Sequence, residues 1–263
     1  MAVVLSYKTS DAKPIPVIIK KTKAESPFQK SKSIQEQYAR ALRGVAREVG
    51  KLIKGYAPKD QISAEKLRRA LRAYAELIVP WAETVSKKII GSINYQDYNA
   101  WRLNSQRMSI ATRKEILSAP IGSTFEELMR ENVRLITSIP LEAAERVHQL
   151  VTENLYKSAR AEEIAKRIME TESVTKSRAT LIARTEVARA ASVLLQARAT
   201  NIGSTGYTWR TSRDLIVRQS HKEMEGRFVK WAEPPTLSDK TVTHAGQIYN
   251  CRCWPDPEIP EIL

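Results

Sequence analysis

GSTGYTWRTSRD, residues 203–214, divides the chain into two parts of different character. Two glycines precede an alternation of Tyr207 and Trp209 with polar residues, a pattern typical of a turn followed by a β-strand. Downstream we expect short strands and loops, with one or two helical turns near residues 220–225. Prolines, which interrupt regular structure, recur in this part of the chain: Pro234, Pro235, Pro255, Pro257 and Pro260.

Upstream of this stretch, the sequence predicts helices. Residues 141–202 contain neither glycine nor proline, the strongest local breakers, so most of them should be helical. A turn with its caps is expected at TESVTKS, residues 171–177. Apolar residues also recur at helical spacing before this region, and Pro80 should kink that helix. The apolar faces predicted for the two regions are Leu67, Leu71, Tyr74, Ile78, Trp81 and Val85, and Leu181, Ala188, Ala191 and Leu195.

These patterns predict a mainly α fold with a small C-terminal α+β module. Residues 8–32 hold seven lysines, two acids and three prolines without sustained periodicity, which indicates an extended basic arm over residues 1–32. Residues 33–202 should form a basic helical bundle or elongated helical array. Residues 203–263 should form the small module of strands and loops.

The charge is distributed unevenly between these parts. The chain has a net charge of +14, whereas residues 205–263 carry eight basic and eight acidic residues, so the whole excess lies in residues 1–204. Such an excess suits DNA or an acidic protein surface, and it also suits the solubility of exposed helices. The sequence has no apolar run long enough for a membrane span and no secretion signal, so we expect synthesis in the cytoplasm.

Both cysteines of the chain, Cys251 and Cys253, lie one residue apart near its end. Side chains at i and i+2 of an extended segment point to one side, so both sulfurs can reach one zinc ion together with His221. Either His244 or Asp214 would be the fourth ligand. Simple burial of two small apolar side chains and redox chemistry are the alternatives, and a disulfide is disfavoured by the short spacing.

Arg213, Asp214, Arg218 and His221 lie within nine residues and are the parts of a phosphodiester-cleaving site. The preferred interpretation of the same residues is an Asp–Arg pair with hydrogen bonds that holds a loop-rich module together. The common phosphate-loop, nucleophile-elbow and metalloprotease motifs are absent from the sequence. On the predicted helix before residue 202, Glu186 and Arg189 are one turn apart and should form a surface pair.

Three segments together resemble the phage head morphogenesis, or minor capsid, proteins of the Mu protein F (SPP1 gp7-like) family. They are RATLIARTEVARA, WRTSRDLIVRQSHKEMEGR and HAGQIYNCRCWPDP, which begin at residues 178, 209 and 244. The resemblance covers roughly residues 120–257. Its characteristic residues fall on Arg184, Thr185, Glu186, Trp209, Asp214, Arg218, His221, Gly226, Cys251, Arg252 and Cys253.

The resemblance implies a low-copy virion protein of a tailed bacteriophage, made in the host cytoplasm and lying in the capsid interior or at the portal vertex. Its expected partner is the portal protein, with scaffolding or major capsid protein and double-stranded DNA as further partners. No enzymatic activity is expected. The alternatives are a metal-assisted phosphodiesterase that uses His221 and Asp214, and a non-enzymatic DNA-binding module.

Overall fold

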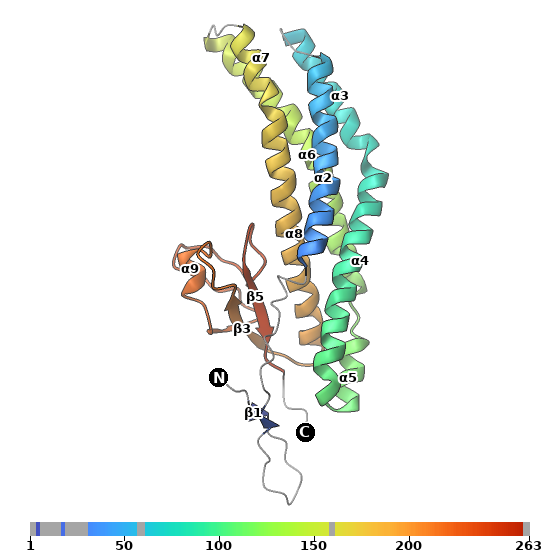
Figure 1. Ribbon diagram of the computed structural model, residues 1–263, viewed down its shortest axis with the longest axis vertical. Coiled ribbons are helices and arrows are strands. Elements are labelled where there is room, and N and C mark those ends of the chain that lie inside the picture. The colour runs from blue at the N-terminus through green and yellow to red at the C-terminus, as the bar shows by residue number, and fades with distance from the viewer. Residues whose placement is uncertain (1–3, 6–16, 19–30, 57–60, 158–160, 260–263) are drawn as a thin grey trace, which may run out of the picture.

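The computed structural model describes residues 4–5, 17–18, 31–56, 61–157 and 161–259 (Figure 1). The basic arm predicted for residues 1–32 lies almost entirely outside these ranges. Within it, the structure describes the antiparallel pairing of β1 (Val4–Leu5) with β2 (Val17–Ile18) and the start of the first long helix.

Long helices packed side by side form an elongated bundle (Figure 1). The helical elements are α2 (Lys32–Tyr56), α3 (Gln61–Leu77), α4 (Val79–Asn104), the 3-10 turn η1 (Ser105–Arg107), α5 (Ile110–Leu117), α6 (Gly122–Lys157), α7 (Ala161–Met169) and α8 (Thr171–Asn201). Among the described helices, none is long and apolar enough to cross a bilayer. With the small sheet that follows, the structure confirms the predicted fold class.

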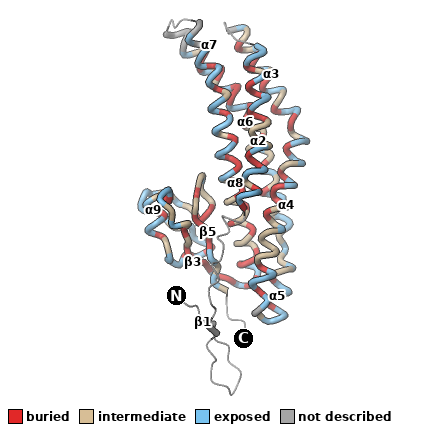
Figure 2. Tube along the Cα trace, viewed as in Figure 1, coloured by how far each residue is buried: buried red, intermediate tan, exposed pale blue. Residues whose placement is uncertain are grey.

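The centre of the bundle is formed by α2 and α8, with α4 and α6 packed around them. Apolar residues of α2 recur every three or four positions, and buried positions recur along this helix (Figure 2). Tyr38, Leu42 and Val45 are among them. Burial of each such side chain contributes roughly 1.5–3 kcal/mol. The one polar group of Tyr38 is satisfied, because its hydroxyl donates to Asn132 Oδ1 at 2.8 Å.

The helix predicted over Leu67 and beyond is interrupted at Ile78 rather than merely kinked. Pro80 lies in the first turn of α4, where its missing N–H leaves no helical hydrogen bond unmade. Leu67 is fully buried as the pattern predicts, whereas Trp81 is 39% exposed. The prediction for Trp81 was wrong because the helix does not continue through the break with the same face inward.

Two details predicted for α8 were also wrong. TESVTKS is the first part of this helix, and the break falls before it, at Glu170. The hydroxyl of Thr175 donates to the Thr171 carbonyl at 2.7 Å, so a residue common in turns is accommodated inside the helix. The fully buried face lies beside the predicted one, and Leu181 is exposed. The buried face of α8 consists of Ile182, Ala183, Val187, Ala190 and Leu194.

The chain changes from helix to strand between Asn201 and Gly206. The elements that follow are β3 (Gly206–Thr211), the short helix α9 (Gln219–Lys222), β4 (Phe228–Lys230) and β5 (Cys253–Pro257). Within the described residues, the strands form an antiparallel sheet in the order β4-β3-β5, with Trp209 opposite Pro255. β5 is an edge strand, which tolerates its prolines because they need not donate to a second neighbour.

The C-terminal module lies against the lower part of the bundle in Figure 1 and shares its core. Trp101 of α4 and Ile202 at the end of α8 pack in one apolar cluster with Tyr207 and Trp209 of β3. A groove of about 470 Å³ remains between α4, α8 and β5. It is lined in part by Ala188, Ala191 and Leu195, which explains why these predicted core positions are only half-buried.

Candidate functional site

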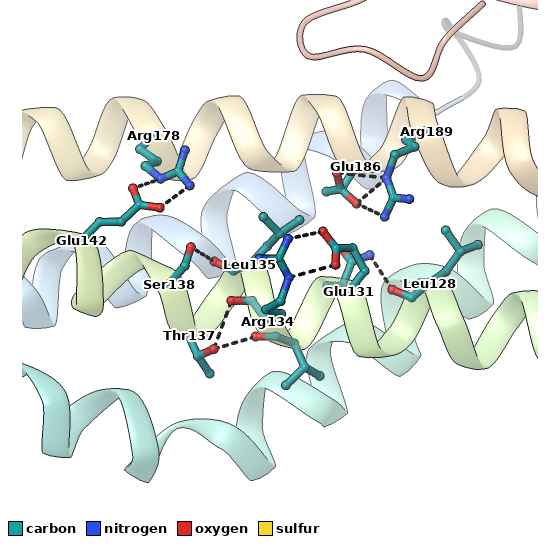
Figure 3. Close-up of polar contacts among 12 residues, drawn as sticks. Leu128, Glu131, Arg134, Leu135, Thr137, Ser138, Glu142, Arg178, Glu186 and Arg189 are labelled. Atoms are coloured by element: carbon teal, nitrogen blue, oxygen red, sulfur yellow. Dashed lines mark hydrogen bonds and ion pairs between the residues drawn. The ribbon is translucent and has the colours of Figure 1, made fainter. Parts of the chain in front are cut away.

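Most of the residues singled out in the sequence lie in the C-terminal module or on the part of α8 that contacts it, whereas Glu186 and Arg189 of α8 lie in the bundle near Glu131 and Arg134 of α6. On α8, Glu186 accepts two hydrogen bonds from Arg189 Nε, at 3.0 and 3.2 Å, and a third from its Nη2 at 2.7 Å (Figure 3). The predicted pair is therefore present. It is not a surface pair, because Glu186 is only 5% exposed. The guanidinium compensates for the burial of this carboxylate.

Arg184 and Thr185 join α8 to the segment before the cysteines. Arg184 Nη1 donates to Asn250 Oδ1 at 2.8 Å, and the Asn250 backbone N–H donates to Thr185 Oγ1 at 3.1 Å. Asn250 has a φ of 54°, a left-handed conformation that asparagine adopts more readily than most residues. These two side chains of α8 thus fix the sharp corner that leads into Cys251.

The next turns of α8 extend this contact along the loop of residues 244–250. Ser192 Oγ donates to the Ala245 carbonyl at 2.8 Å. Gly246 follows with a φ of 83°, and a Cβ atom there would lie 3.2 Å from both the Ser192 Cβ and the Cys253 carbonyl. Gly246 therefore permits both the turn and the close approach of the loop to α8.

Asp214 connects the loop after β3 to the segment between the two cysteines. Its carboxylate pairs with Arg252 at 2.6 Å and accepts from the Ser212 hydroxyl at 3.0 Å and the Ile216 N–H at 3.1 Å. Burial opposes ionisation of Asp214, but these hydrogen bonds and the Arg252 charge outweigh it and lower the pKa of the carboxyl group. Asp214 is thus engaged in holding two loops together.

Arg218 makes a second connection between the same regions. Its Nη2 donates to the Tyr249 carbonyl at 3.1 Å, and its guanidinium carbon lies 4.7 Å from the centroid of the Tyr249 ring. The nearby Arg213 instead pairs with Glu225 at 2.9 Å. The two arginines and Asp214 therefore do not converge on one another.

Trp209 and Gly226 connect β3 to the segment that follows α9. Gly226 has a φ of 80° and donates its N–H to the Trp209 carbonyl at 2.8 Å, while the Trp209 N–H donates to the Arg227 carbonyl at 2.8 Å. The fully buried Trp209 ring meets the His221 ring edge to face, with centroids 5.5 Å apart. This packing fixes the orientation of the imidazole.

His221, Cys251 and Cys253 converge in the interior of the module. His221 Nδ1 lies 3.3 Å from Cys253 Sγ and 3.5 Å from Cys251 Sγ, and each residue is at most 5% exposed. The two sulfurs share a hydrogen bond, which lowers the pKa of the Cys251 thiol and raises that of the Cys253 thiol. An imidazole nitrogen and two thiol sulfurs are groups of the kinds that bind transition metals.

The two other residues predicted as ligands have different partners. His244 Nδ1 lies 3.2 Å from the Tyr207 hydroxyl, and burial lowers the pKa of its imidazole. Asp214 is paired with Arg252, as described above. Within the described part of the chain, the group of potential metal-binding atoms that lie within 4.8 Å of one another comprises His221, Cys251 and Cys253.

Sequence reasoning missed two residues of this region. Asn250 accepts a hydrogen bond from Arg184 and donates its backbone N–H to Thr185. Glu225 accepts hydrogen bonds from the Thr211 N–H and hydroxyl at 2.6 and 2.8 Å. Asparagine tolerates the left-handed conformation, so Asn250 itself is a local signal for a turn at this position. The partner 65 residues upstream could not be identified from local pattern.

Comparison with known proteins places the similarity in this region. Residues 145–254 match the family described as Phage Mu protein F like protein. The chain is 28% identical over 195 residues to an uncharacterized protein of Haemophilus influenzae. That alignment covers 73% of the chain but 43% of the relative, so the chain spans less than half of that protein's length. No solved structure matches.

Proposed function

We propose that the chain is a head morphogenesis protein of a tailed bacteriophage, because residues 145–254 match the family described as Phage Mu protein F like protein. In this proposal it is a minor capsid protein that associates with the portal and enters the procapsid in low copy. It acts by binding and carries out no enzymatic reaction.

The observation that best supports this proposal is that the polar residues characteristic of the family bind other parts of the same chain. Arg184 and Thr185 bind Asn250, Asp214 binds Arg252, and Arg218 binds Tyr249. Each contact joins two segments of the chain that are distant in sequence. Residues engaged in this way favour a structural unit for assembly, since a catalytic site needs polar groups that face a substrate.

The loop that Asp214 holds provides a candidate contact for the portal. Leu215 and Ile216 are adjacent large apolar residues, 96% and 69% exposed. Asp214 Oδ1 fixes their turn by accepting from the Ile216 N–H. Apolar side chains exposed to water at the tip of this loop would be stabilised by burial against a partner. We assign the portal contact to this tip.

Coexpression of the full chain with the portal protein of the same phage tests this assignment. We expect the two proteins to copurify, and we expect Leu215→Asp/Ile216→Asp to reduce recovery of the portal at least tenfold. The matched control is Ile110→Asp, which charges an equally exposed apolar residue at the start of α5. Failure of the unmodified chain to copurify contradicts portal association, and an equal loss with Ile110→Asp contradicts the role of the tip.

Charge supports DNA as an additional partner. The excess of 14 positive charges lies wholly in residues 1–204, and the module that contains the cysteines is neutral. Binding through phosphate contacts should weaken steeply with salt, by a slope of about 0.9 per phosphate contacted. Titration of the chain with a DNA duplex at several salt concentrations measures this slope. A slope near zero, or no binding at low salt, removes DNA from the proposal.

A further inference from the structure

The cluster of His221, Cys251 and Cys253 has the dimensions of a metal site. A tetrahedral zinc ion with Zn–S bonds of about 2.3 Å and a Zn–N bond of about 2.0–2.1 Å places nitrogen and sulfur about 3.6 Å apart. The observed separations from Nδ1 are 3.3 and 3.5 Å. All three donor atoms lie within 4.8 Å of one another, so a central ion can reach them with small side-chain adjustments.

The environment of the cluster suits a bound cation. Its three side chains are buried, and a thiolate there would be costly without a compensating positive charge. A zinc ion bound between the two sulfurs supplies that charge to both of them. The thiolate and imidazole donors favour zinc over the oxygen-preferring Ca²⁺ and Mg²⁺.

Room for a fourth ligand exists next to the cluster. A cavity of about 40 Å³ is lined by His221 and Cys251 together with Arg218, Asn250 and Arg252. One water molecule needs roughly 10–15 Å³ measured in this way. The three protein donors and a water molecule would complete a tetrahedral shell, so neither His244 nor Asp214 is required.

We propose that His221 Nδ1 and the sulfurs of Cys251 and Cys253 bind one zinc ion, with water as the fourth ligand. The ion would join α9, which carries His221, to β5 and to the corner at Asn250 where α8 is docked. Its role would be structural, because a bridge between these elements stabilises a module with a small core of its own. This inference is independent of the proposed function in head assembly.

Metal analysis of the full chain, expressed in zinc-supplemented medium and purified without chelators, tests the proposal. We expect one zinc ion per chain and none in Cys251→Ser/Cys253→Ser. The control His148→Asn changes a half-buried histidine of α6 and should retain one zinc ion. A chain reconstituted with cobalt should show the thiolate-to-metal charge-transfer absorption of tetrahedral sulfur coordination.

Each result of these measurements either supports the zinc site or overturns it. A zinc-free full chain that also takes up no zinc on dialysis overturns the proposal, as does unchanged zinc content in Cys251→Ser/Cys253→Ser. If that variant does not fold, the cobalt form of the unmodified chain decides the matter. Thiolate charge-transfer bands then support the site, and a spectrum without them overturns it. Portal copurification is measured separately, so either proposal can fail alone.

Discussion

At the residue scale, hydrogen bonds to single side chains hold the module against the bundle. Asn250 illustrates this, because its backbone and side chain both bind residues of α8. Such contacts contribute modestly when made, but a half-buried donor left without a partner costs more. The corner before Cys251 should therefore be sensitive to changes that alter almost no volume.

Thr185→Val should lower the free energy of unfolding by about 1 kcal/mol, because it removes the acceptor of the Asn250 N–H while keeping the shape of the side chain. Chemical denaturation measures the change. Thr180→Val is the matched control on α8, where the hydroxyl donates only to the Lys176 carbonyl of its own helix. Equal effects of the two substitutions would contradict the importance of the contact with Asn250.

Glu225 should make the stability of the module depend on pH. Burial alone would raise the pKa of this carboxyl group, but hydrogen bonds from Arg213 and Thr211 outweigh burial and lower it below the ordinary 4.5. A lowered pKa in the folded state gives stability that is fully present above the ordinary pKa and is lost as pH falls through the lowered one.

Denaturation at a series of pH values between about 3 and 7 tests this dependence. Glu225→Gln should be less stable than the unmodified chain at neutral pH and should lose less stability on acidification. Glu233→Gln, at an exposed position of the same module, should follow the unmodified chain. A Glu225→Gln chain with the full acid dependence would show that the hydrogen bonds of Glu225 do not set it.

At the scale of elements, the order of helices and strands follows from local patterns. The absence of glycine and proline from residues 141–202 predicts helix there, and the described residues of that stretch are helical apart from the break at Glu170 and the last residue, Ile202. The alternation around Trp209 predicts β3, which the structure confirms. These features depend on neighbours in sequence, so local reasoning reaches them.

The inward faces of the helices were harder to predict. α8 packs against α2, α4, α6 and the C-terminal module. Its own apolar residues therefore lie on more than one face of the helix, and no single apolar stripe identifies the buried face. The cluster of His221, Cys251 and Cys253 could be predicted in part from the sequence, because the spacing of the two cysteines places both side chains on one side of an extended segment. The contacts of Asn250 and the pairing of Asp214 with Arg252 rather than a nearer arginine depend on tertiary packing.

Gly206→Ala should disrupt the pairing of β3 with β4. A Cβ atom at this position would overlap the Val229 carbonyl oxygen and the Phe228 ring. We expect a loss of about 1–3 kcal/mol in the free energy of unfolding, typical of overpacking. Gly55→Ala in α2 meets nothing within 4 Å and should instead gain up to about 1 kcal/mol. Thermal unfolding distinguishes the two, and a stabilised Gly206→Ala would contradict the close approach of β4 to Gly206.

At the scale of the whole molecule, a long basic bundle carries a neutral module at its side (Figure 1). The bundle offers an extended surface, and the module offers the exposed tip at Leu215 and Ile216. This division suits a protein that contacts more than one component during head assembly.

The position of α2 limits where the chain can be truncated, because α2 begins at Lys32 and packs along α8. Deletion of residues 1–30 spares every described helix, whereas deletion of residues 1–60 removes α2.

The most direct test of the proposed function is the amount of this chain in purified procapsids. Procapsids would be assembled in cells from the capsid, scaffolding and portal proteins of the same phage, with and without the portal, and this chain would be quantified in each by mass spectrometry. The proposal predicts a few copies in procapsids that contain the portal and none in those that lack it. Absence from procapsids with the portal, or equal amounts in both, would contradict it.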